Sequence, residues 1–440
     1  MKKVAIIGAG WAGLAACAAL RDAGAQVTVF EAGRTPGGRA RRVVHPDFGG
    51  HLDNGQHILL GAYQQTLALM RRLGRNPATL LMRRSLRLSS LDGAFNLAAP
   101  ALPAPFHALA ALVTARGLSW ESRLAAIRLM RGLQKQGWRT PRDWTVSRLL
   151  SHYQQPAQIV QRLWEPLCLA ALNTPLDEAS ADLFARILQD SLTGDRRNSD
   201  LLLPCVDLSA LWPDAVALHA TMRYGATVRH LKPGDYWVDV NRERFDAAVL
   251  AVPPFVAARL LEDALLDADS PGLLHALQAF EYVPIATLNL RLAAPWPLPA
   301  PMMLLREDKS RGHWGQWVFD RSRLTGRSPE SELAIVTSAA RALSSESRET
   351  IIANLTQQVT EQAARHPSRL PPMPAVVAAE LFVEKRATFA AEPGLNRPLN
   401  STPWPTLALA GDWTDTGYPG VLEGAVRSGL KAAQVLLAGK

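Results

Sequence analysis

The first thirty residues show a short hydrophobic run, a glycine-rich stretch, an alanine-rich stretch and a second hydrophobic run. Residues 4–7 are uninterrupted and apolar, which is typical of a strand buried on both faces. The glycines fall within 8–13, and residues 14–23 fit a helix. Residues 26–30 form the second run, which ends at Glu31. This order predicts the start of a Rossmann-like α/β fold with a parallel sheet.

The glycine-rich stretch Gly-Ala-Gly-Trp-Ala-Gly has the spacing of a dinucleotide-binding turn. In such a turn Gly8 permits a sharp bend, Gly10 lets a pyrophosphate approach the backbone, and Gly13 lets helix and strand pack closely. Glu31 is placed to accept hydrogen bonds from an adenosine ribose, which disfavours NADP because its 2′-phosphate would meet this negative charge. The predicted nucleotide contacts here are Gly8, Ala9, Gly10, Trp11, Ala12, Gly13 and Glu31.

Two motifs that follow Glu31 resemble those of the flavoprotein superfamily of amine oxidases, phytoene desaturases and protoporphyrinogen oxidases. The first is Gly37-Gly38-Arg39, and the resemblance implies that this arginine pairs with the pyrophosphate of FAD. The second is the segment 53–57, Asp-Asn-Gly-Gln-His, which in that superfamily runs beside the isoalloxazine ring. The resemblance implies FAD contacts at Gly38, Arg39, Gly55 and Gln56, with Gly55 allowing a close backbone approach.

The C-terminal part of the chain resembles the closing strand and helix of the same superfamily. The resemblance implies that Asp412, in Ala-Gly-Asp, binds the ribityl chain and that a helix from near Gly420 points its amides at the flavin. Small residues recur along 420–429 at helical spacing, which fits either a close ring or strand or tight helix packing. A fourth match around Val228 implies contact with adenine. The implied contacts are Val228, Gly411, Asp412, Gly420 and Val421.

Because these motifs lie at both ends and in the middle of the chain, we expect a discontinuous FAD-binding domain of the amine oxidase type. We assign it residues 1–85, 200–258 and 385–440. The segments 86–199 and 259–384 have apolar content of their own and no nucleotide motif, so they are predicted to form an inserted α+β substrate-binding domain.

The cysteine and glycine patterns limit the chemistry further. The three cysteines lie far apart, so we expect neither a metal site nor disulfides, and we expect a reducing, cytoplasmic setting. No cysteine follows Cys205 and the C-terminal motif has no histidine, so we expect non-covalent FAD. No second dinucleotide fingerprint occurs, so the electrons must come from an external donor.

Composition is that of a globular protein, with 48% hydrophobic and 20% charged residues, but the formal charge is +9. Such a charge attracts anionic membranes or nucleic acid, and no nucleic-acid-binding motif is present, so we expect no nucleic-acid partner. Prolines interrupt the longest apolar segment, 97–115, so no membrane-spanning helix is expected. That segment and a basic helix capped by Ser119 fit peripheral contact with the inner face of an anionic membrane, or else a solvated basic surface.

Longer strings narrow the resemblance to the squalene-associated flavoenzymes of bacterial hopanoid pathways, the hydroxysqualene dehydroxylases. They are residues 53–61, 164–174, 202–208, 316–321 and 411–417. The resemblance implies an isoprenoid lipid substrate and replacement of the allylic hydroxyl of hydroxysqualene by hydrogen to give squalene. Two alternatives stay open, namely an oxidative isoprenoid desaturase and an assembly subunit that FAD merely stabilises.

His57 and Gln56 are the catalytic candidates. A histidine beside the flavin ring, titrating near neutrality, can donate a proton to the leaving hydroxyl or orient it, and Gln56 can assist by hydrogen bonding. The alternative for His57 is a purely structural role. Asp320 and Asp415 are competing candidates. Four tryptophans fit either an isoprenoid tunnel or ordinary core packing, and they are Trp164, Trp314, Trp317 and Trp413.

Overall fold

A five-stranded parallel sheet unites the two ends and the middle of the chain in the computed structural model, which describes residues 2–268, 270–326 and 330–438. The strand order is β10-β2-β1-β14-β20, and all neighbours run parallel. The α/β class predicted from the sequence is confirmed. The strands are β1 (Lys3–Ile7), β2 (Gln26–Glu31), β10 (Thr221–Tyr224), β14 (Ala247–Leu250) and β20 (Leu407–Leu409).

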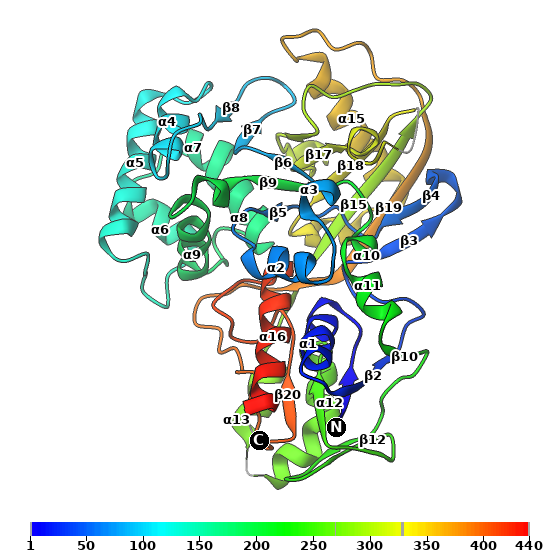
Figure 1. The fold of residues 1–440 in the computed structure, drawn as a ribbon. Coiled ribbons are helices and arrows are strands. Elements are labelled where there is room, and N and C mark those ends of the chain that lie inside the picture. The colour runs from blue at the N-terminus through cyan, green and yellow to red at the C-terminus, as the bar shows by residue number, and fades with distance from the viewer. Residues whose placement is uncertain (1, 269, 327–329, 439–440) are drawn as a thin grey trace.

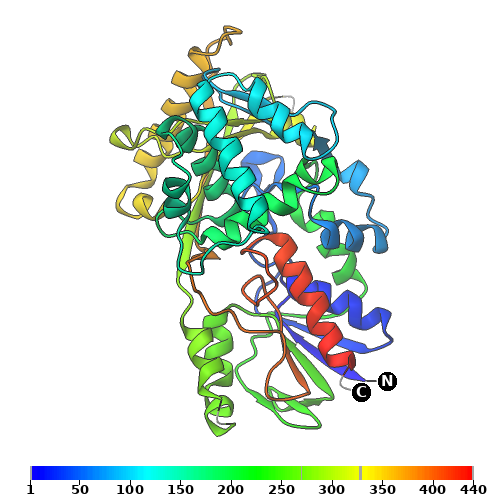
Figure 2. The same ribbon diagram turned by 90° about the vertical axis from the view of Figure 1, so that its left-hand side faces the viewer.

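Helices α1 (Trp11–Asp22) and α16 (Leu422–Ala438) pack side by side against this sheet, although they lie at opposite ends of the chain (Figures 1 and 2). A Cβ atom on Gly429 would lie 2.1 Å from the carbonyl oxygen of Ala12, so glycine is required for the close contact. The small-residue face of the C-terminal helix therefore serves tight helix packing at Gly429. Gly420, just before the helix, lines a cavity instead.

A second five-stranded sheet, ordered β16-β17-β18-β15-β19, is antiparallel. Its strands are β15 (Tyr282–Leu292), β16 (Met302–Leu304), β17 (Trp317–Asp320), β18 (Glu332–Thr337) and β19 (Val376–Phe389). Helix α15 (Arg348–Ala364) packs on one face, where Leu288, Leu290 and Ile335 belong to a separate apolar cluster. Figure 1 places this sheet above the parallel one and opposite the helical insertion.

Helices between residues 106 and 192 form the helical insertion, drawn in cyan to green at the upper left of Figure 1. They are α4 (Phe106–Thr114), α5 (Trp120–Lys135), α6 (Val146–His152), α7 (Ala157–Ile159), α8 (Glu165–Leu172) and α9 (Ala181–Leu192). Ser119 caps α5 as expected, because its hydroxyl accepts a hydrogen bond from the Ser122 amide. The leucines of this helix differ in burial, since Leu124 is 58% exposed while Leu133 is fully buried.

The other elements connect these layers. The strands are β3 (Arg42–His45), β4 (Gly50–Asp53), β5 (Leu59–Leu60), β6 (Leu81–Arg84), β7 (Arg87–Ser89), β8 (Asn96–Ala98), β9 (Leu201–Pro204), β11 (Leu231–Pro233), β12 (Val238–Val240) and β13 (Glu243–Phe245). The helices are α2 (Gln64–Arg72), α3 (Pro77–Leu80), α10 (Leu208–Leu211), α11 (Pro213–Leu218), α12 (Pro254–Asp267), α13 (Pro271–Gln278) and α14 (Arg321–Thr325). Short 3₁₀ or π turns span 46–48, 160–164, 196–199, 309–311 and 340–345.

Two of the expected domain boundaries fall inside regular elements. The boundary after residue 258 lies within α12, and the boundary after 384 lies within the long strand β19. Strand β19 thus runs continuously from the second sheet to the region where the parallel sheet begins. Among the helices that the structure describes, none has the length and apolar content needed to cross a bilayer.

Candidate flavin site and adjoining apolar cavity

A cavity of about 550 Å³ lies between the parallel sheet and the second sheet, and most of the predicted cofactor residues line it. Residues from the second sheet, such as Phe319 and Val336, close one side. Ala9 and Gly13 are absent from the lining. The predicted residues in the lining are Gly8, Gly10, Trp11, Ala12, Glu31, Gly38, Arg39, Gly55, Gln56, His57, Val228, Gly411, Asp412, Gly420 and Val421.

The glycine turn at residues 8–13 has the geometry of a nucleotide cradle. Gly8 has a φ of +105°, and a Cβ on Gly13 would lie 2.0 Å from the Gly8 carbonyl oxygen, so Gly13 serves packing. A Cβ on Gly10 would meet no described atom within 4 Å and would occupy open space in the cavity. The Glu31 carboxylate accepts hydrogen bonds of 2.7 Å from the amides of Ala9 and Gly33, which fixes it at the end of β2.

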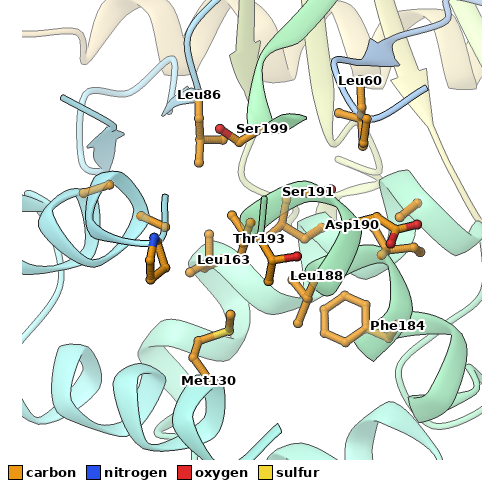
Figure 3. A pocket seen from close by; sticks show the side chains of 18 of the residues that line it. Leu60, Leu86, Met130, Leu163, Phe184, Leu188, Asp190, Ser191, Thr193 and Ser199 are labelled. Atoms are coloured by element: carbon orange, nitrogen blue, oxygen red, sulfur yellow. The ribbon is translucent and has the colours of Figure 1, made fainter. Parts of the chain in front are cut away.

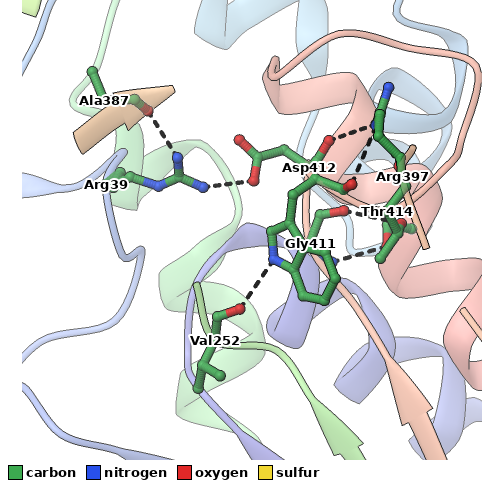
Figure 4. A network of polar contacts seen from close by, with 9 residues as sticks. Arg39, Val252, Ala387, Arg397, Gly411, Asp412 and Thr414 are labelled. Carbon is green, nitrogen blue, oxygen red and sulfur yellow. Dashed lines mark hydrogen bonds and ion pairs between the residues drawn. The ribbon is translucent and has the colours of Figure 1, made fainter. Parts of the chain in front are cut away.

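Arg39 and Asp412 join the two ends of the chain across the cavity (Figure 4). Arg39 Nη2 donates to Asp412 Oδ1 at 2.6 Å, and Arg39 Nη1 donates to the Ala387 carbonyl at 2.8 Å. Burial works against the charge on Arg39, but the ion pair with Asp412 outweighs it, so the pKa of Arg39 lies above its ordinary value. The guanidinium therefore provides a fixed positive charge at the cavity, as an anionic pyrophosphate requires.

Arg397 organises the loop that follows Asp412, and sequence reasoning missed it. Its guanidinium donates to the backbone carbonyls of Asp412, Trp413, Thr414 and Tyr418 (Figure 4). Burial lowers the pKa of Arg397 to about 10, which still leaves it charged at neutral pH. The sequence carries no signal for this role, because the acceptors are main-chain atoms brought close only by the fold.

His57 lines the same cavity as a neutral base. Its Nδ1 lies 2.8 Å from the Gly55 carbonyl oxygen, and since that oxygen can only accept, Nδ1 carries the hydrogen. Burial lowers the pKa of His57, and the charge of Arg39 adds to this, against the hydrogen bond to Gly55. Neutral His57 consequently offers Nε2 as an acceptor, so this geometry favours an orienting role over proton donation.

Gln56 is the other catalytic candidate, and the competing aspartates lie elsewhere. The Gln56 side chain also lines the flavin cavity and makes a long, 3.4 Å contact with the His57 carbonyl. Asp320 is buried but caps α14 by accepting from the Arg323 amide. Asp415 is exposed and absent from the linings of both cavities.

A second cavity, of about 440 Å³, adjoins the first and is almost wholly apolar (Figure 3). Its walls come mainly from the helical insertion, with Leu163, Phe184 and Leu188 among them. Of the described residues that line it, Arg131 and Asp190 alone carry charged side chains. Six residues line both cavities, namely Ile58, Tyr63, Ala170, Ala171, Trp317 and Val421.

The tryptophans divide between the cavities and the core. Trp164 and Trp317 line the apolar cavity, and Trp413 lines the flavin cavity. Trp314 lines neither and donates to Glu346. The Trp317 Nε1–H is buried without a hydrogen-bond partner among the described residues. An orphaned donor at the junction of two cavities fits a site built to receive a bound molecule, and the glycine cradle and Arg39 fit the phosphates of FAD.

Residues 11–437 match the family model described as flavin containing amine oxidoreductase. The chain is also 31% identical to a protein named hydroxysqualene dehydroxylase from Rhodopseudomonas palustris, over 99% of each chain. The chain belongs to this family, and within the family it groups with the hydroxysqualene dehydroxylases. It is therefore a flavin-dependent oxidoreductase. The resemblance seen in the sequence motifs is confirmed.

Two further similarities of this flavin-dependent oxidoreductase are informative. A protein named probable zeta-carotene desaturase, from Synechococcus elongatus, is 33% identical, but only over 28% of this chain and 26% of its own. The solved structure of cyclohexylamine oxidase from Brevibacterium oxydans superposes with a TM-score of 0.69 at 19% identity, over 99% of both chains. That structure establishes the shared fold.

We expect Gly10→Val to abolish flavin retention without impairing folding. The added side chain meets no described atom around Cβ, so the apoprotein should unfold within about 1 kcal/mol of the unsubstituted apoprotein, while the cradle is blocked. Flavin absorbance after gel filtration and thermal unfolding of the apoproteins measure the two effects. Gly272→Val, also at an open position, is the matched control and should keep its flavin. Full retention by Gly10→Val would contradict this placement of the phosphates.

Proposed function

We propose that this flavoenzyme removes the allylic hydroxyl of hydroxysqualene reductively and releases squalene. The observation that carries the proposal is the apolar cavity that shares six wall residues with the flavin cavity. An isoprenoid hydrocarbon gains hydrophobic stabilisation from such walls, and a volume near 440 Å³ lies within the usual range of ligand pockets, about 300–1,000 Å³. The naming of the full-length relative supports the same substrate.

FAD, held without a covalent bond, is the cofactor we propose. We assign Glu31 to the adenosine ribose, Val228 to the adenine and Arg39 to the pyrophosphate, and these residues line the cavity. We assign Asp412, which also lines it, to the ribityl chain. The three cysteines support non-covalent binding, since Cys17, Cys168 and Cys205 are absent from the cavity lining. Acid precipitation of the protein should therefore leave the colour in the supernatant.

The described residues suggest how the chain supports such a reaction. Reduced FAD supplies a hydride when bound, and an external donor replaces the electrons. Apolar walls such as Leu163 and Leu188 exclude water, so an allylic cation formed from the substrate is not recaptured by solvent. Neutral His57 is placed to accept a hydrogen bond from a group in the flavin cavity, and Gln56 can support it.

Anaerobic incubation of the photoreduced flavoprotein with hydroxysqualene should yield about one squalene per flavin in a single turnover, with oxidation of the flavin. Lipid chromatography and flavin absorbance measure the two products. The same incubation with oxidised flavin is the control and should leave the alcohol unchanged. Reduced, flavin-loaded protein that forms no squalene would refute the proposed reaction.

The desaturase alternative predicts the opposite redox direction. It requires oxidised flavin and yields a hydrocarbon with an additional double bond, so the same chromatography distinguishes it. Its support from the comparisons is partial, since one zeta-carotene desaturase matches 28% of this chain and another matches 46%. The assembly-subunit alternative predicts that a variant unable to cycle its flavin still supports squalene production. Formation of squalene by the purified, photoreduced protein in a single turnover would exclude this alternative.

We further propose that the helical insertion rests on an anionic membrane from which the lipid enters. Large apolar side chains are exposed on α4 and α5 beside the apolar cavity, and Phe106 and Leu109 also line it. Trp120, 65% exposed, is stacked by the Arg123 guanidinium at 4.5 Å from the ring centroid. The exposed arginines Arg116, Arg128 and Arg131 provide charge complementarity to anionic headgroups. Exposed apolar residues on this surface are Leu102, Phe106, Leu109, Val113, Trp120 and Leu124.

The double variant Phe106→Glu, Trp120→Glu should weaken binding to phosphatidylglycerol vesicles at least tenfold. Two exposed apolar side chains that would enter the bilayer are replaced by negative charges that the headgroups repel. Vesicle cosedimentation measures this. Tyr236→Glu alters a tyrosine that is 87% exposed on a different part of the chain and should bind normally. Equal binding of the double variant and the unsubstituted protein would contradict the proposed contact surface.

A further inference from the structure

A polar group formed by Asp190, Tyr418 and Arg427 stands in the wall of the apolar cavity. The Tyr418 hydroxyl donates to Asp190 Oδ2 in a short hydrogen bond and accepts from Arg427 Nη2 at 3.1 Å. The Arg427 guanidinium also lies 4.0 Å from the centroid of the Tyr418 ring. Asp190 and Tyr418 both line the cavity, and Figure 3 shows Asp190 on α9 near Ser191 and Thr193. A carboxyl among apolar walls is unfavourable unless it is hydrogen-bonded, as Asp190 is to Tyr418.

This polar group includes a residue, Tyr418, that is close in sequence to the flavin cavity lining. Tyr418 precedes Val421, which lines both cavities, by three residues, so their Cα atoms are at most about 11 Å apart. The loop that carries Tyr418 is held by Arg397, which binds the Tyr418 carbonyl. The hydroxyl of Tyr418 is thus presented by a fixed backbone, next to the junction of the two cavities.

Two other hydroxyl groups in the cavity wall, those of Thr193 and Ser199, are engaged locally. Thr193 donates to the Gln189 carbonyl of its own helix, and Ser199 donates to the Arg196 carbonyl. Tyr418 uses one lone pair for Arg427, so a second remains available to a ligand hydroxyl. The pair of Asp190 and Tyr418 therefore combines a donor and acceptors for an alcohol that must otherwise lie unpaired in an apolar cavity.

We propose that Asp190 and Tyr418 bind the hydroxyl group of the lipid substrate and deliver the proton with which it leaves. This inference rests on the proposed function and adds two catalytic residues to it. Arg427 is a positioning residue, because it contacts Tyr418 and, through Nε, the buried carboxylate of Glu423 at 2.8 Å. Glu423 in turn accepts from the Thr66 amide at the start of α2, which anchors the group.

The proton moves in a relay that leaves Tyr418 neutral. In the resting group the Asp190 carboxylate accepts the hydrogen bond from Tyr418. Once Asp190 has taken up a proton from solvent, it passes this proton to the Tyr418 oxygen while Tyr418 passes its own to the substrate oxygen. The allylic C–O bond breaks with both electrons on oxygen, and water leaves. A bound reduced flavin would supply the hydride for the allylic carbon and would lose two electrons in doing so. Burial and the hydrogen bond to Asp190 raise the pKa of Tyr418, which disfavours a phenolate and fits a relay.

Binding to the oxidised flavoprotein tests recognition without turnover. Trp164 and Trp317 line the cavity, so quenching of tryptophan fluorescence reports the occupancy. Unsubstituted protein should bind hydroxysqualene about tenfold more tightly than squalene, the value expected for one satisfied hydrogen bond. Tyr418→Phe and Asp190→Asn should lose this preference while their affinity for squalene changes less than about twofold. Asp182→Asn, on the same helix but outside the cavity, should keep it.

Single turnover of the reduced flavoprotein tests proton delivery. Both variants should form squalene at least about a hundredfold more slowly, whereas Asp182→Asn should match the unsubstituted protein. Flavin absorbance confirms that each variant is folded and loaded. If both variants keep the preference for the alcohol, the inference is overturned. If the unsubstituted protein forms no squalene but Tyr418→Phe abolishes the preference, the reaction proposed above fails while the hydroxyl-binding site stands.

Discussion

The ion pair between Arg39 and Asp412 is the contact on which the rest of the site depends. It joins residues 373 positions apart and closes the flavin cavity between the two ends of the chain. The Asp412 side chain is nearly buried, so removing Arg39 would leave a charge in a poorly solvated position, which is far more destabilising than the loss of an exposed pair. Asp412 also begins the loop that Arg397 holds by its carbonyls, and this loop leads to Tyr418 and Gly420.

The flavin cavity carries the charged side chains, whereas the second cavity is almost wholly apolar. Around the flavin cavity, Arg39 provides a positive charge that suits a phosphate, and the carboxylates of Asp412 and Glu31 are acceptors that suit hydroxyl groups. Beyond the shared residues, apolar helices form the walls of the second cavity. A hydrocarbon that contacts these walls is stabilised because its apolar surface leaves water. Because residues such as Trp317 and Val421 belong to both linings, an atom of a ligand in the apolar cavity can come close to the flavin cavity.

Sequence reasoning succeeded where the chemistry is local. The turn at 8–13, the strand ending at Glu31 and the Ser119 cap are each encoded within a few residues, so spacing alone identified them. It failed where a role depends on distant partners. Arg397 binds carbonyls fifteen or more residues away, and Gly429 is required by the carbonyl of Ala12 at the other end of the chain. The lowered pKa of His57 could not be predicted from the sequence either, because it follows from burial and from the neighbouring charge of Arg39.

The proposed pair of Asp190 and Tyr418 also explains how a long, repetitive hydrocarbon can be held at one position along the cavity. Isoprenoid units contact walls such as Leu163 and Phe184 in almost the same way after sliding by one unit, so hydrophobic burial alone does not select a position. A hydroxyl does, because beside Asp190 and Tyr418 it gains hydrogen bonds that apolar side chains such as Leu163 do not offer. Once the hydroxyl has left as water, the product retains the hydrophobic contacts but loses this anchor. Its register is no longer fixed, and its release toward α4 and α5 becomes easier than that of the substrate.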